Sequence, residues 1–258
     1  MTYSIKDFQH ELDSRTASSV LNHDVTRSIL NFLKEKGLEK VYTYLYESSC
    51  PQLTAKTSPE LFRSLDEVCK SFGLEMRPKV FVTRNYHERV FLRGVNEPFI
   101  VLSSEYLKKL DEETLKGILA GQVAGIRCSH HTIFYITWGI EFASSLVPIP
   151  FATTIVMSFI NEWKRNRWFT YDKAFALATK NRTLSLQQVL INAVPRNILN
   201  KMNLGTTEDA FIAQANRFVN EMDKKQAGIK EVVSRFSEKD WLPERYKELE
   251  KFFDERRA

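Results

Sequence analysis

The sequence contains little glycine and little cysteine. Nine glycines in 258 residues accompany 18 phenylalanines and 9 tyrosines, which favours a helix-rich core packed with aromatic rings over a fold rich in tight turns. The three cysteines, Cys50, Cys69 and Cys128, cannot all pair with one another, and their spacing is not that of a metal site. We therefore expect reduced thiols and a cytoplasmic protein.

Charge of one sign is not concentrated anywhere in the chain. The 37 Lys and Arg residues and the 32 Asp and Glu residues give a net charge of +5. Because the basic residues are dispersed, we expect no nucleic-acid partner. The residues after Met1 are not apolar, so we also expect no signal peptide.

A long uninterrupted apolar run is also absent. The most apolar segment, 132–161, has Glu141 as its only charge, but Pro148 and Pro150 divide it. Each half is shorter than the roughly 20 residues that a bilayer span needs. Two interpretations remain: a helical hairpin that is buried in the protein or in an oligomer, or a hairpin that enters one face of a membrane peripherally. Tryptophans and basic residues near its ends favour the second: Trp138, Trp163, Trp168, Lys164, Arg165 and Arg167.

The patterning predicts an α+β fold. Apolar residues at helical spacing follow Asp24 up to Gly37, and a second helix is expected from Pro59 to Gly73. Three β-branched or aromatic runs then predict a small three-strand sheet of antiparallel or mixed character, at 79–83, 89–93 and 99–102. Further helices are expected after Asp111 and over 132–161, 172–179, 184–193, 207–222 and 243–256.

Three motifs give the chain a resemblance to a known family. They are Arg-Val-Phe-Leu-Arg-Gly at 89–94, the helix that begins Asp-Glu-Glu-Thr-Leu at 111–115, and Arg-Asn-Arg-Trp-Phe-Thr-Tyr-Asp at 165–172. In this order and at these distances, over residues 76 to 178, the chain resembles the HtpX-like and CAAX prenyl endopeptidase family of zinc metallopeptidases. That family has Asn-Ala-Phe-x-x-Gly on a strand, His-Glu-x-x-His on a buried helix, and Arg-x-x-Glu-x-x-Ala-Asp on a later helix. The resemblance implies a mostly helical, zincin-like scaffold whose sheet packs on the former active-site helix.

The chain differs from this family at every position that carries the chemistry. The two histidine ligands fall on Gly121 and Gly125, the general base on Gln122 and the third ligand on Trp168, while Asp172 and Gly94 are retained. Glycine and tryptophan offer zinc no ligand, and glutamine does not take a proton from water at neutral pH. We therefore expect no metal, no cofactor and no peptidase activity. We also expect the Trp168 indole to fill the emptied site by lying across Gly121 and Gly125.

The main enzymatic alternative is a zinc site or a hydrolase site at residues other than the motif positions of the resembled family. Cys128 and His131 are three residues apart and could share a helix face, with Glu141 or Glu162 as a distant third zinc ligand. The same pair could serve a Cys–His hydrolase, although neither an orienting group nor an oxyanion hole is legible. The plainer interpretation is a helix end at which the histidines meet the C-terminal dipole and solvent.

The leading hypothesis is a pseudopeptidase that binds a protein or peptide partner. We expect one unit, with residues 1–75 as an N-terminal helical extension and 76–258 as the metallopeptidase-like domain. Arg89, Phe91 and Arg93 are the expected docking residues, because a substrate of the resembled family lies along this edge strand. The alternative is a membrane-peripheral or oligomeric structural protein that acts through 132–161.

Overall fold

Most of the described chain is helical. The computed structural model describes residues 2–84, 89–146, 152–191 and 241–256, together with residues 210, 213 and 217. The helices before the sheet are α1 (Ile5–Phe8), α2 (Glu11–Leu21), α3 (Asp24–Glu35), α4 (Leu38–Glu47) and α5 (Pro59–Ser71). The later helices are α6 (Ser104–Leu107), α7 (Glu112–Arg127), α8 (His130–Leu146), α9 (Ala152–Thr179), α10 (Arg182–Ile191) and α14 (Leu242–Glu255).

Helix boundaries lie where the local sequence predicts them. Asp111 is the N-cap of α7, and its side chain accepts a hydrogen bond of 2.7 Å from the backbone N–H of Thr114. Pro59 occupies the first turn of α5. Gly37 and Gly73 follow α3 and α5 with φ of +64° and +65°, a conformation in which glycine has no steric penalty.

The sheet has four strands, so the predicted count of three is wrong. The strands are β1 (Gln52–Leu53), β2 (Lys79–Thr83), β3 (Val90–Arg93) and β4 (Phe99–Ser103), in the order β1-β2-β4-β3. β2 and β4 are parallel, whereas β1–β2 and β3–β4 are antiparallel. The additional strand has only two residues, too few for an alternating pattern to be recognised in sequence.

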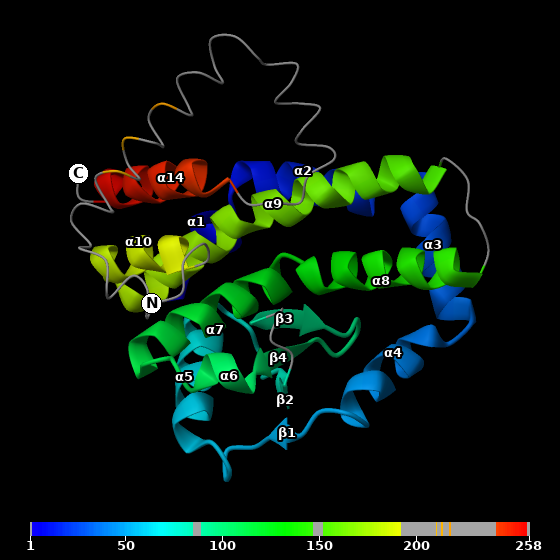
Figure 1. Cartoon of the computed structure of the whole chain (residues 1–258), viewed down its shortest axis with the longest axis horizontal. Helices are drawn as coiled ribbons and strands as arrows, with labels where there is room; N and C mark the ends of the chain where they lie inside the picture. Colours follow the sequence, from blue (N-terminus) through cyan, green and yellow to red (C-terminus); the bar gives the residue numbers. More distant parts are fainter. Residues whose placement is uncertain are drawn as a thin grey trace.

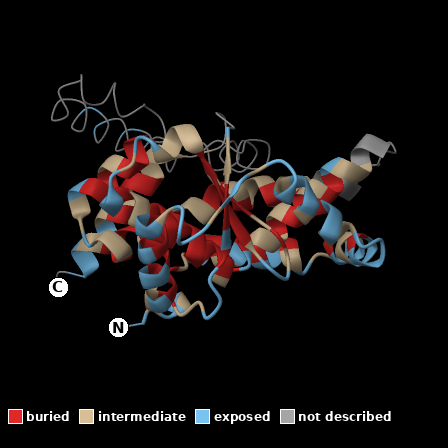
Figure 2. Ribbon diagram, turned by 90° about the horizontal axis from the view of Figure 1, so that it is seen from below, coloured by how far each residue is buried: buried red, intermediate tan, exposed pale blue. Residues whose placement is uncertain are grey.

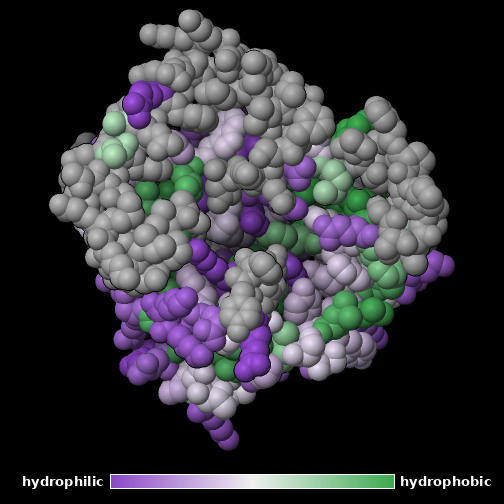
Figure 3. Space-filling model, viewed as in Figure 1, coloured by the Kyte–Doolittle hydropathy of each residue, from purple (hydrophilic) through white to green (hydrophobic). Residues whose placement is uncertain are grey.

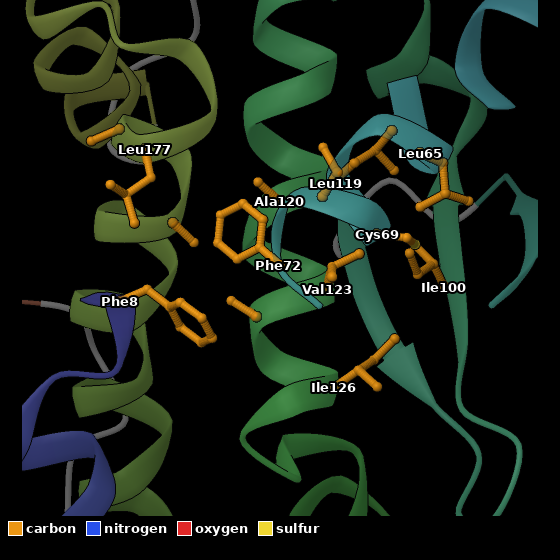
Figure 4. Close-up of a cluster of buried hydrophobic side chains, with 14 of the residues drawn as sticks. Phe8, Leu65, Cys69, Phe72, Ile100, Leu119, Ala120, Val123, Ile126 and Leu177 are labelled. Atoms are coloured by element: carbon orange, nitrogen blue, oxygen red, sulfur yellow. The ribbon is translucent and has the colours of Figure 1, made fainter. Parts of the chain in front are cut away.

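α7 lies at the centre of the molecule, between the sheet with α5 on one side and α9 on the other (Figure 1). Its apolar residues and those of the strands form the main core together with Phe8 and Phe72 of the N-terminal segment. Figure 4 shows Phe8 and Phe72 between α9 and α7, and Ala120 and Val123 on α7 itself. In Figure 2 the strands are buried along most of their length. The N-terminal helices are thus part of the same core as residues 76–191.

The segment 132–161 forms the end of one helix and the start of another. α9 runs without interruption from Ala152 to Thr179, so the separate helix expected at 172–179 is not present. In the described part, Ile133, Ile136 and Ile160 are buried against Val20 of α2. No helix in the described residues is both long enough and apolar enough to cross a bilayer.

Met76 and, within α9, Ile155 are exposed, and a larger group of exposed apolar side chains lies on α3 and α4. This group consists of Phe32, Val41, Tyr44 and Leu45, and Figure 3 shows hydrophobic residues gathered on the side of the molecule that α3, α4 and α8 form. The two prolines at 148 and 150, and all of the helix expected at 207–222 except residues 210, 213 and 217, lie outside the described residues.

Candidate functional site

A cavity of about 360 Å³ lies between the sheet edge, α7 and α9. Residues of β3, α7 and α9 make most of its wall, and Tyr106 of α6, Phe134 of α8 and Gln188 of α10 complete it. Several of the positions singled out in the sequence line this cavity together: Arg89, Phe91, Gly121, Gln122, Trp168 and Asp172. Segments that are far apart in the chain, from Arg89 to Gln188, thus enclose one space.

β3 lies at one edge of the sheet, beside β4, and the side of β3 that has no neighbouring strand faces this cavity. The N–H of Ser103 donates to the carbonyl of Arg89 at 2.9 Å, which fixes the alternation along the β3–β4 ladder. Arg89, Phe91 and Arg93 direct their backbone groups toward β4, whereas Val90 and Leu92 direct theirs away from it.

Val90 and Leu92 together have four backbone groups that point away from β4, and one of these four groups already has a hydrogen-bond partner. The Leu92 carbonyl accepts a hydrogen bond of 2.9 Å from Nη1 of Arg93. No described residue bonds to the N–H or the carbonyl of Val90 or to the N–H of Leu92. Val90 is half-buried, whereas Leu92 is fully buried, so the unpaired groups of Val90 are the ones on this edge strand that another extended chain could reach.

Tyr171, and not Trp168, covers the glycine face of α7. A Cβ added at Gly121 would lie 3.4 Å from the Tyr171 Cβ, and one added at Gly125 would lie 2.8 Å from the Tyr171 hydroxyl. The expectation that the Trp168 indole lies across both glycines is therefore wrong. The residue that fills this space follows Trp168 by one turn, at the position where the resembled motif has alanine.

Trp168 instead lines the cavity beside the glycine face. Its ring is half-buried and meets the Tyr171 ring edge-on at 5.5 Å between centroids. Gln122 lies in the same wall, is 5% exposed, and its Oε1 has no hydrogen-bond partner. The Trp168 N–H therefore makes no hydrogen bond to the Gln122 Oε1.

No protein-family profile matches the chain, and the searches of curated proteins and of solved structures found none that is significantly similar to it. The resemblance to zinc metallopeptidases therefore stays a hypothesis that the motifs alone support.

The three expected docking side chains are engaged within the molecule. Phe91 is buried in a cluster with Phe81 and Phe99, on the face of the sheet away from α7. Arg93 donates from Nε to the Tyr46 hydroxyl at 2.7 Å, and its guanidinium lies 4.3 Å from the centre of the Phe91 ring. The Phe91 and Arg93 side chains are therefore committed to contacts within the molecule. A partner could reach mainly the backbone of the strand and the Arg89 side chain.

Asp172 is held in a buried ion pair. Its two carboxylate oxygens accept hydrogen bonds of 2.8 Å from Nε and Nη2 of Arg245, which is 1% exposed. The same guanidinium lies 4.7 Å from the centre of the Trp168 ring. Because both oxygens are committed, Asp172 positions α14 against α9 and is not available as a general base.

A second cluster of potential ligands lies behind Tyr171. The side-chain ligand atoms of Asp13, Cys128 and His130 lie within 4.8 Å of one another, and all three residues are buried. His130 bonds Asp13 through Nε2 at 3.0 Å and the Tyr171 hydroxyl through Nδ1 at 3.3 Å. This is the one such group among the described residues, and it contains His130, not the His131 that the sequence paired with Cys128.

The chemistry of this cluster favours a polar contact between helices. Asp13 also accepts a hydrogen bond of 2.6 Å from the Thr170 hydroxyl. Burial raises the pKa of the Cys128 thiol, and the nearby Asp13 raises it further. A protonated thiol is a poor nucleophile and a poor metal ligand, which weakens both the relocated zinc site and the Cys–His hydrolase.

Sequence reasoning missed two side chains of the cavity wall, Arg167 and Gln188. Arg167 had been treated as part of a basic group that flanks the apolar segment. Helical spacing offered a signal, because 167, 168, 171 and 175 share one face of α9. Gln188 had no such signal, because α10 comes to the cavity only through tertiary packing.

Proposed function

We propose that this protein is a pseudopeptidase: a metallopeptidase-like chain without peptidase activity that binds peptides or unfolded protein segments. The observation that carries the proposal is that the unpaired edge of β3 faces a cavity whose opposite wall holds Gly121, Gln122 and Trp168. These are the positions at which the resembled family has its zinc ligands and base. The space beside the strand is retained while the residues for hydrolysis are replaced.

Binding of this kind needs no metal. An extended peptide would pair with the backbone of Val90, adding a strand to the sheet, and its alternate side chains would enter the cavity. Main-chain hydrogen bonds supply affinity in this mode and do not depend on the identity of the side chains at 121, 122 and 125.

Selection from a displayed random-peptide library on the purified protein tests the proposal. We expect enriched peptides to bind the wild type and to lose affinity when alternate peptide nitrogens are methylated, because methylation removes the N–H groups that pair with the strand. A Val90→Pro variant removes the outward N–H of β3 and should weaken binding at least tenfold.

Val90→Ala is the matched control, because it shortens the same side chain and keeps the N–H. Proline is tolerated on edge strands when its nitrogen faces outward, so both variants should fold. Enrichment of no peptide, or equal binding by Val90→Pro and Val90→Ala, contradicts strand addition. Cleavage of a casein substrate by the pure wild type, absent from a Gly121→Leu variant that fills the cavity, would contradict the loss of activity.

A further inference from the structure

Arg167 brings an uncompensated positive charge to the cavity. Its Nε donates to the carbonyl of Lys164 at 3.1 Å, and its guanidinium lies 4.8 Å and 5.0 Å from the ring centres of Phe134 and Trp168. No carboxylate of the described residues pairs with it. The surrounding rings hold the group in place and leave its remaining N–H donors without an acidic acceptor.

Arg89 adds a second such charge on the other side of the cavity. Its Nη1 donates to the carbonyl of Ile191 at 2.9 Å, and the group lies 5.6 Å from the centre of the Tyr106 ring, again without an ion pair. Among the described lining residues the sole carboxylate is Asp172, which Arg245 neutralises. A concave, largely apolar space with two unpaired guanidinium groups concentrates a positive potential.

Two buried amides in the same wall lack partners for their oxygens. Gln122 is 5% exposed and Gln188 is 9% exposed, and neither Oε1 accepts a hydrogen bond. An unmade hydrogen bond of a buried oxygen costs about 1–3 kcal/mol. Both oxygens are enclosed by protein atoms, so a ligand in the cavity would meet the two guanidinium groups and not these oxygens.

We propose that the cavity recognises a carboxylate carried by a peptide, and that Arg167 and Arg89 bind this carboxylate. This inference rests on the proposed function and specifies its ligand. Two sources offer the same chemistry, an acidic side chain within the peptide or the carboxylate at its C-terminus. Guanidinium groups that are already held by aromatic rings lose little entropy when they bind a carboxylate.

Fluorescence anisotropy with degenerate octapeptide libraries tests the proposal. One central position is fixed as Glu, Gln or Lys, the other positions are mixed, and each library is made with a free C-terminal acid and with a C-terminal amide. We expect at least one carboxylate form to bind the wild-type protein about tenfold or more tightly than its neutral counterpart. A preference for fixed Glu in the amide series identifies the side chain, and a preference for the free acid over the amide identifies the C-terminus.

Arg167→Met and Arg89→Met keep most of the apolar stem and remove the charge, so each should reduce the preference for the carboxylate. Arg63→Met is the matched control, because Arg63 is exposed on α5 and its loss changes the net charge equally. It should leave the preference unchanged.

The outcomes separate the two proposals. If all libraries bind equally and Val90→Pro abolishes binding, strand addition stands and carboxylate recognition is overturned. If no library binds, both proposals fail. If Arg63→Met reduces the preference as much as Arg167→Met does, the effect is one of net charge, and the specific site is overturned.

Discussion

Tyr171 determines how the glycine face of α7 is packed. Its ring lies over Gly121 and Gly125, and its hydroxyl reaches His130 behind them. One side chain therefore joins the wall of the cavity to the buried contact between α2 and α8. Burial raises the pKa of this hydroxyl, so it remains protonated and able to donate a hydrogen bond at physiological pH.

Two glycine substitutions one helical turn apart should have opposite effects. Gly121→Ala should stabilise the protein by up to about 0.5–1 kcal/mol, because alanine favours the helix and the added methyl meets Tyr171 at ordinary contact distance. Gly125→Ala should destabilise it by about 1–3 kcal/mol, because the methyl would lie 2.8 Å from both the Tyr171 hydroxyl and Cδ1 of Leu92. Urea unfolding measures both.

Adding Tyr171→Phe to Gly125→Ala removes one of the two close contacts and should recover part of the loss. Equal effects of the two alanines would contradict the placement of Tyr171.

Tyr171→Ala should cost about 3–5 kcal/mol of the free energy of unfolding, because a buried ring is removed. Trp168→Ala should cost less, since that ring is half-buried at the cavity. Thermal and urea unfolding of both variants measure the difference. A larger loss for Trp168→Ala would restore the expectation that the indole fills the former metal site.

His131 should make the protein less stable in mild acid. Burial, and to a smaller extent the neighbouring His130, lowers the pKa of its side chain to about 4. Between the ordinary value near 6.5 and about pH 4, the unfolded chain binds a proton that the folded chain does not, so stability falls as the pH falls through this range.

His131→Gln should lose about 1–2 kcal/mol less stability than the wild type between pH 7 and pH 4. Urea unfolding at a series of pH values measures this. Parallel stability curves for the two proteins would show that His131 titrates normally.

At the scale of elements, α14 is attached to α9 through the Arg245–Asp172 pair. Arg245→Met should destabilise the protein by about 3–5 kcal/mol, because it leaves the Asp172 carboxylate buried and unpaired. The double variant Arg245→Met, Asp172→Asn should recover much of this loss, since no charge then remains buried. Chemical unfolding of the two variants tests the pair, and an equal loss in both would show that packing of Arg245, not its charge, holds α14.

At the scale of the whole molecule, we expect no stoichiometric zinc. Asp13, Cys128 and His130 offer three ligand atoms, but Asp13 and His130 already bond each other and the thiol has a raised pKa. Elemental analysis after dialysis should find far less than one zinc per chain, and a chelator should leave the thermal midpoint unchanged. About one zinc per chain that Cys128→Ser abolishes would establish a metal site in this cluster.

Local sequence signals were sufficient to predict several helix boundaries. They did not predict features that depend on a contact between distant segments of the chain. Asp111, Pro59 and Gly73 act on their own neighbours, so their roles were predictable. The motif spacing brought Gly121, Gln122, Trp168 and Asp172 to one place as expected. It did not predict which ring fills that place, because Trp168 and Tyr171 lie on adjacent parts of one helix face.

The sequence by itself determined the α+β class, the three longer strands and the start of α7, because hydrophobic periodicity and capping residues are properties of short segments. Tertiary structure decided the rest. The pairing of β3 at the edge of the sheet, the partner of His130 and the absence of a carboxylate beside Arg167 depend on segments far apart in the chain. Such contacts follow from how whole helices pack, and no local pattern of residues encodes them.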